Sequence, residues 1–227
     1  MKTVVIVAHP DYSDSSTQQF LLESGKHLEE VYYHFIDDKE IDGHKERQLL
    51  EKYDRIIFQF PMYWYSAPYE LKKWIDQVFD DSFIKGRMEG EGKELGLVVT
   101  LGVAEESFAA GKAEKFTLSE LFRPFEALAS KCQMIYLPIF SVSLFHYMSE
   151  VNRKALLIKY QQYLTKSNEA TFKSEEEWFI TYLEKYRERF SDERKRRIDL
   201  ILNQVKENRE TLDDLLVLVK EMREDAY

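Results

Sequence analysis

Hydroxyl-bearing side chains are concentrated in a short segment near the N-terminus. The ten residues from His9 to Gln18 follow an apolar run, carry five hydroxyl groups and lead into a predicted helix over residues 16–29. The unpaired N–H groups and positive dipole end of such a helix favour a phosphate. Ser15, Ser16 and Thr17 add possible hydroxyl donors, and His9 adds a ring N–H. The alternative, that Ser15 or Ser16 only caps the helix, stays open at this point.

A second segment is rich in aromatic residues. Tyr63, Trp64 and Tyr65 are consecutive and lie between Pro61 and Pro68, a pattern that excludes a helix interior. Together with Met62, these flat side chains suit a planar ring system. The alternative is a hydrophobic plug that only covers the end of a sheet.

A third segment, Thr100-Leu101-Gly102-Val103, contains a glycine directly after an apolar run. Gly102 would allow the backbone to approach a ligand closely. The segment is informative because its position matches that of the first two: each directly follows an apolar run.

The order of the predicted elements explains that match. Apolar runs predict strands, and amphipathic segments between them predict helices; the strands cover residues 3–8, 31–36, 55–60, 95–100 and 133–140, and the further helices residues 45–52, 68–79, 118–131 and 150–164. Alternating strands and helices are typical of an α/β fold with a doubly wound parallel sheet. Five strands favour the flavodoxin-like order 2-1-3-4-5, in which ligands bind beyond the carboxyl ends of the strands. Each of the three segments follows a strand, so all three should meet at that edge.

These segments resemble those of the flavodoxin-like NAD(P)H:quinone oxidoreductase family. The chain is most similar to the bacterial branch that contains the ancillary flavoproteins of glutathione-gated potassium efflux systems. The resemblance covers roughly residues 1–165 and rests on Val5-Ile6-Val7-Ala8-His9-Pro10, on residues 60–68 with 71–79, and on residues 121–127, Cys132 and Tyr136-Leu137-Pro138.

The resemblance implies a flavin site. His9, Ser15, Thr17 and Gln18 would hold the flavin phosphate, although Gln18 stands where the family usually has Asn. The residues that would line the ring are Pro61, Met62, Tyr63, Trp64 and Tyr65. Thr100, Gly102 and Val103 would offer backbone groups to its pyrimidine edge, where N–H donors stabilise developing negative charge.

The chain also departs from the family at the third segment. The family commonly has Thr-Thr-Gly-Gly where this chain has Thr100-Leu101-Gly102-Val103. A Tyr and a His of better-studied relatives align with Phe108 and Ala113, which do not titrate. We still expect Leu101 and Phe108 to border the cofactor, but a proton must then come from water, another residue or a partner subunit.

Residues 171–227 differ in composition from residues 1–170, the predicted flavin-binding domain. The 57 residues include 27 charged side chains and no Gly or Pro, so we expect a helical extension, with a capping box that starts at Ser174. Two helices are predicted, over residues 174–190 and 191–224. Apolar side chains recur at heptad spacing in the second, with Asn208 as the polar exception: Ile198, Ile201, Val205, Leu212, Leu215, Val219 and Met222. This seam should pack either on the same subunit or on a second subunit.

Composition excludes several other classes of protein. The net charge of −9 argues against non-specific nucleic-acid binding, and no apolar run is long enough to insert into a membrane. The single Cys132 excludes an intrachain disulfide and a cysteine-rich zinc site, which favours the cytoplasm.

We therefore expect an enzyme, an NAD(P)H dehydrogenase (quinone). NADPH or NADH would give hydride to FMN, with FAD as the alternative, and the flavin would reduce a small quinone-like acceptor. The protein would be a homodimer. One alternative is a regulatory or carrier flavoprotein that docks on a transporter or redox partner, which the extension favours. A weaker one is a family member that has lost its flavin.

Overall fold

The computed structural model describes residues 1–36, 40–80, 92–168 and 171–224. The chain forms two compact units, Met1–Ser167 and Asn168–Tyr227, which are described separately below.

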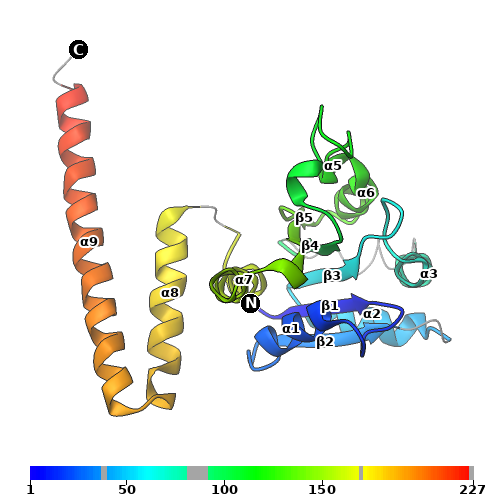
Figure 1. Ribbon diagram of the computed structural model, residues 1–227, viewed down its shortest axis with the longest axis horizontal. Coiled ribbons are helices and arrows are strands. Elements are labelled where there is room, and N and C mark those ends of the chain that lie inside the picture. The colour runs from blue at the N-terminus through cyan, green and yellow to red at the C-terminus, as the bar shows by residue number, and fades with distance from the viewer. Residues whose placement is uncertain (37–39, 81–91, 169–170, 225–227) are drawn as a thin grey trace. The chain divides into compact units, whose positions relative to one another are not determined.

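The first unit is built on a parallel sheet. Its first four strands are β1 (Thr3–Ala8), β2 (Val31–Ile36), β3 (Arg55–Pro61) and β4 (Glu94–Leu101). They lie in the order β2-β1-β3-β4, followed by β5 (Figure 1). Every pair of neighbouring strands is parallel, with Val4 opposite Tyr32 and Ile56, for example. The predicted flavodoxin-like order 2-1-3-4-5 is confirmed.

The far edge of the sheet differs from the prediction. The single strand expected over residues 133–140 is two strands, β5 (Ile135–Tyr136) and β6 (Phe140–Ser143), so the sheet has six strands. β5 pairs with the beginning of β4, and β6 pairs with its end. Pro138 lies in the break and has no N–H to donate to a strand ladder.

Helices connect the strands in the predicted positions. They are α1 (Ser16–Gly25), α2 (Gly43–Glu51), α3 (Tyr69–Val78), α5 (Leu118–Leu121), α6 (Arg123–Lys131) and α7 (Glu150–Thr165). The helix expected over residues 118–131 breaks at Phe122, because Pro124 cannot donate to the preceding turn and its ring would clash there. The first helix ends at Gly25 rather than at residue 29.

The two faces of the sheet are unlike. One face is apolar: alternate residues of the strands, such as Phe58 and Phe60, pack with α2, α3, α5 and α6 in a core that includes the fully buried Trp74. Phe58 meets the Trp74 ring edge-on at 6.0 Å between centroids. Area removed from water on this face supplies the main stabilisation of the fold.

The opposite face carries buried polar groups that bond to α1 and α7. Thr3 Oγ1 donates to the Leu164 carbonyl at 2.7 Å, and Tyr160 Oη donates to Gln59 Oε1 at 2.6 Å. Gln59 Nε2 donates in turn to Gln18 Oε1 at 2.7 Å. Burial raises the pKa of Tyr160 well above its usual value, so its hydroxyl stays a donor. These bonds fix how α7 lies on the sheet.

The second unit is a pair of helices. They are α8 (Phe172–Tyr186) and α9 (Asp192–Glu224), joined through the short 3₁₀ turn η3 (Arg187–Arg189). The predicted capping box at Ser174 is wrong by three residues. Thr171 is the N-cap, and its Oγ1 accepts from the Ser174 N–H at 3.1 Å, so Ser174 takes the third helical position instead. Among the described residues, no helix has the length and apolar character needed to cross a membrane.

Candidate functional site

The three predicted segments meet at the carboxyl ends of the strands. There they border a hollow of about 300 Å³ together with the turn after β6. The lining residues are His9, Ser15, Thr17, Pro61, Met62, Tyr63, Thr100, Leu101, Gly102, Val142, Leu144, Phe145, His146 and Tyr147. The position at a strand-end edge is the one that doubly wound folds use for ligands.

The first loop presents the beginning of α1 to the hollow. Ser15 is the N-cap, and its hydroxyl accepts from the Gln18 N–H at 3.4 Å, so the capping alternative is correct for Ser15. The cap does not remove Ser15 from the site, because both Ser15 and Thr17 line the hollow. The helix start therefore offers N–H groups and hydroxyls together, as anion sites do.

His9 is held in one orientation by its own loop. Its Nδ1 accepts the Asp11 N–H at 3.0 Å, so the neutral ring carries its proton on Nε2. Burial lowers the pKa of His9, and the nearby Asp11 only partly offsets that effect. At neutral pH His9 is thus a neutral donor through Nε2, which suits an anionic ligand.

The aromatic segment forms a tight and strained turn. Tyr63 and Ser66 exchange backbone hydrogen bonds of 2.9 and 3.0 Å. The two residues between them, Trp64 and Tyr65, have φ of +46° and +62°. Positive φ at both central positions is typical of a type I′ turn, which favours Asn and Gly. Side chains with a Cβ pay roughly 1–2 kcal/mol each in this region.

Only part of the aromatic segment faces the hollow. Pro61, Met62 and Tyr63 line it. Trp64 is 91% exposed, and Tyr65 Oη donates to Glu114 Oε2 at 2.9 Å, which raises the pKa of Tyr65 and keeps its hydroxyl protonated. The bond also ties this turn to the loop after β4.

The third segment leaves open space where a ligand can approach. A Cβ built on Gly102 would have no heavy atom within 4 Å. Gly102 lines the hollow with Thr100 and Leu101, while the Met62 N–H donates to the Thr100 carbonyl at 3.0 Å. Backbone groups and a missing side chain at one wall suit a flat ring that lies close to the chain.

Six predicted site residues do not line the hollow: besides Trp64 and Tyr65, these are Ser16, Gln18, Val103 and Phe108. Ser16 and Val103 are exposed, and Phe108 is buried in the apolar core. Gln18 is fully buried behind the first loop, where Gln59 holds its carbonyl oxygen. Gln18 therefore packs between the first loop and the sheet, where it bonds to Gln59 of β3.

The turn after β6 supplies lining residues that sequence reasoning did not assign. It is the 3₁₀ turn η2 (Phe145–Tyr147), which brings His146 and Tyr147 to the hollow. The Leu144 N–H donates to the Leu101 carbonyl at 3.1 Å, and Leu144 has φ of +49°. The sequence offers one signal for the position of this turn. Pro138 interrupts the predicted strand over residues 133–140, and the strand that begins after it, β6, pairs with the end of β4.

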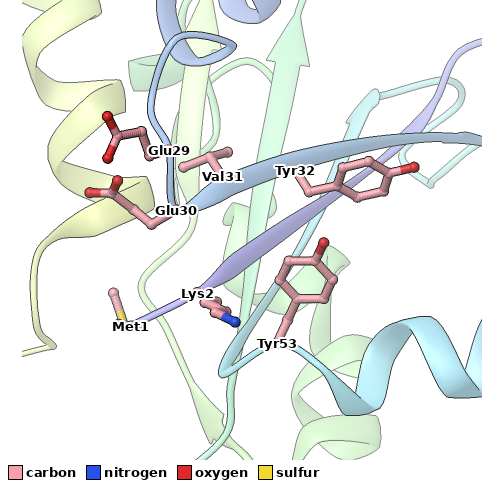
Figure 2. A pocket seen from close by; sticks show the side chains of 7 residues that line it. All are labelled: Met1, Lys2, Glu29, Glu30, Val31, Tyr32 and Tyr53. Atoms are coloured by element: carbon pink, nitrogen blue, oxygen red, sulfur yellow. The ribbon is translucent and has the colours of Figure 1, made fainter.

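A second hollow lies at the opposite, amino-terminal edge of the sheet. It has a volume of about 520 Å³, and Figure 2 shows its lining, with the Tyr32 and Tyr53 rings facing each other and Glu29 and Glu30 at its rim. The two tyrosine rings stack at 6.0 Å. This edge is not where sheets of this kind bind ligands. The described residues contain no group of three or more His, Cys, Asp or Glu side chains placed to hold a metal ion.

Comparison with known proteins agrees with this architecture. Residues 1–164 match the family model described as "Flavodoxin-like fold", so the chain belongs to that family. The family prediction is confirmed.

Curated relatives match the same part of the chain. An uncharacterized NAD(P)H oxidoreductase of Bacillus subtilis, YrkL, is 40% identical over 147 residues, which cover 62% of this chain and 84% of the relative. The glutathione-regulated potassium-efflux system ancillary protein KefG of Erwinia tasmaniensis is 36% identical over 59% of this chain and 76% of its own length.

Solved structures give the same fold. A protein of P. pentosaceus named as an NADPH-quinone reductase superposes with a TM-score of 0.70 and 46% identity, over 73% of this chain and 98% of the other. General stress protein 14 of Treponema denticola, solved in complex with FMN, has a TM-score of 0.64 and 28% identity, over 72% and 98%.

Proposed function

We propose that this protein is an FMN-dependent NAD(P)H oxidoreductase whose acceptor is a small quinone-like molecule. The observation that carries the proposal is the hollow at the strand ends, where a helix start, a strained aromatic turn and an open glycine meet. The relatives named as NAD(P)H oxidoreductase and NADPH-quinone reductase support the reaction class.

The residues of the hollow fit FMN. Ser15, Thr17 and the Nε2–H of His9 would hold its phosphate at the start of α1. Met62 and Tyr63 would flank the ring, and the open wall at Gly102 would admit its edge. FMN is preferred over FAD, and the FMN complex of the Treponema protein supports that choice.

Bound FMN would supply the hydride chemistry, because it accepts a hydride from a nicotinamide and passes it on. The residues of the chain itself would bind FMN and orient it. Backbone N–H groups of the segment from Thr100 to Val103 would stabilise negative charge at the ring's pyrimidine edge. Tyr63, at the start of the turn, forms part of one wall of the hollow.

Two measurements on the purified protein test this proposal directly. The protein should release FMN, identified by its mass, and it should oxidise NADPH or NADH at steady state when a soluble quinone is the acceptor. Gly102→Val should lower FMN affinity at least tenfold with an unchanged unfolding transition, because its side chain enters open space rather than the core. Gly102→Ala serves as a graded control. Protein that neither holds flavin nor oxidises the nicotinamide would refute the proposal.

A regulatory or carrier role is the second candidate. The similarity to KefG and the helical extension favour it. FMN binding without quinone-dependent nicotinamide oxidation would support this candidate instead. We also propose that the chain acts in the cytoplasm as a homodimer.

His146 is a candidate for proton delivery, since the positions aligned with the relatives' Tyr and His do not titrate. It lines the hollow, and its turn is anchored to the end of β4. His146→Gln should lower kcat with the quinone several-fold and leave FMN affinity unchanged. His44→Gln, on α2, is the control. Equal rates for His146→Gln and the unmodified protein would remove His146 from the reaction.

A further inference from the structure

The hollow at the strand ends has room for one ligand. Its volume of about 300 Å³ lies at the lower end of the range for sites that enclose a single drug-sized molecule, roughly 300–1,000 Å³. On the proposed function, FMN is that molecule. The acceptor must then lie at the mouth of the hollow, against the flavin ring and against side chains that reach beyond the space that FMN fills. The residues at the mouth therefore decide which acceptor is bound.

Two exposed tyrosines line the hollow from segments on either side of β4. Tyr63 follows β3 and Tyr147 follows β6, and both strands pair with the end of β4, which Gly102 follows directly. Neighbouring strands are about 4.8 Å apart, so β3 and β6 lie roughly 10 Å apart across β4. Tyr63 is 46% exposed and Tyr147 is 86% exposed. A flat molecule at Gly102 would thus have a tyrosine on each side.

The turn that carries Tyr147 is fixed by the residues around it. The Leu144 N–H donates to the Leu101 carbonyl at 3.1 Å, and the Tyr147 N–H donates to the Leu144 carbonyl at 2.9 Å. Phe145 is buried, and the Arg153 guanidinium lies 4.9 Å from its ring. The Tyr147 side chain itself makes no hydrogen bond or ring contact with any residue that the structure describes. An anchored turn thus holds an exposed ring that contributes no such contact to the fold.

We infer that Tyr147 binds the acceptor and selects fused two-ring quinones over one-ring quinones, an inference that rests on the proposed function. Tyrosine offers a large flat contact area at a low cost in conformational entropy, because its side chain has few rotatable bonds. Aromatic rings prefer offset stacked or edge-on contacts, which suit the flat body of a quinone. A two-ring quinone presents the larger apolar area, so it gains more from a ring at the edge of the mouth.

Equilibrium binding tests this inference without turnover, because an oxidised quinone does not react with oxidised flavin. The purified flavoprotein is titrated with menadione, a methylated naphthoquinone, and with duroquinone, a methylated benzoquinone, while the flavin absorbance is followed. Tyr147→Ala should raise the dissociation constant of menadione about tenfold and that of duroquinone about threefold at most. Tyr147→Phe keeps the ring and should bind both quinones as the unmodified chain does. Tyr32→Ala is the matched control, because Tyr32 is 47% exposed but lies at the opposite edge of the sheet.

Steady-state rates at saturating NADPH give a second readout. A contact made equally in the ground and transition states changes KM and leaves kcat unchanged. Tyr147→Ala should therefore raise the KM for menadione about tenfold at an unchanged kcat, whereas the rate with ferricyanide, an acceptor without a ring, should not change.

Two results would overturn the inference. One is an equal dissociation constant for menadione in Tyr147→Ala and in the unmodified chain, and the other is an equal loss of affinity for both quinones. A failure of the proposed function is distinguishable from these, because the unmodified chain would then hold no FMN or reduce no quinone, and the inference would fall with it.

Discussion

Replacing Arg55 with methionine should destabilise the first unit by about 3–5 kcal/mol, the usual cost of removing one partner of a buried ion pair. Arg55 is 2% exposed, and its Nε donates to Glu94 Oε2 at 2.6 Å. Its other nitrogens donate to the carbonyls of Tyr163 and Lys166 at the end of α7. Methionine would leave a buried carboxylate and two carbonyls without this donor. The midpoint of thermal unfolding should fall by about 6–20 °C for a domain of this size.

Lys154→Met is the matched control for that experiment. Lys154 also pairs with a glutamate, Glu150, at 2.6 Å, but both side chains are more than two thirds exposed. Exposed pairs of this kind contribute less than about 1 kcal/mol. Arg55→Lys should be intermediate, because one ammonium cannot reproduce the planar fork that serves three acceptors. Equal losses for Arg55→Met and Lys154→Met would contradict the assignment.

Replacing Trp64 with Asn and Tyr65 with Gly should make the protein more stable and its flavin site weaker. Asn-Gly is the preferred pair for a turn with two positive φ angles, so the strain is relieved. The gain should be roughly 1 kcal/mol in urea unfolding, after subtracting the exposed hydrogen bond from Tyr65 to Glu114. FMN affinity should fall several-fold, because the variant loses the Tyr65–Glu114 bond that ties the turn to the loop after β4, and Tyr63 at the start of the turn lines the hollow.

Single variants separate the two effects. Trp64→Gly removes a side chain that is 91% exposed, so it should gain stability with little loss of packing. Tyr65→Phe keeps the ring and loses only the bond to Glu114. If the double variant is less stable and binds FMN normally, then the strain in this turn does not contribute to FMN binding.

Much of the sheet could be predicted from the sequence. Strands β1 to β4 agree with the prediction to within one residue at each end. β1, β3 and β4 are buried on both faces and are therefore continuous apolar runs, whereas β2 is a partly exposed edge strand rich in aromatic residues. The break between β5 and β6 was missed, since which part of β4 each strand joins is decided by pairing across the sheet. The buried polar groups on the opposite face were also missed. Gln59 bonds to Tyr160, 101 residues away, and no local pattern indicates that bond.

The same limit applies to the site. The rule that ligands lie at the carboxyl ends of parallel strands predicted that three loops would meet, and in the structure they border one hollow. It could not predict that Phe108 turns into the core or that Gln18 lies behind the first loop. Nor could it place His146 and Tyr147, because their turn depends on how the strand restarts after Pro138.

The bonds between the sheet and the end of α7 also bear on synthesis of the chain. Thr3 bonds to Leu164, and Arg55 bonds to Lys166, so the first unit cannot be completed until residue 166 has been made. Ribosomes add about 5–20 residues per second, so residues 171–227 take roughly 3–11 s more. Mixed α/β domains usually fold in milliseconds to seconds. The first unit therefore has time to fold before synthesis ends and the chain, with its exposed apolar residues 212–222, is released.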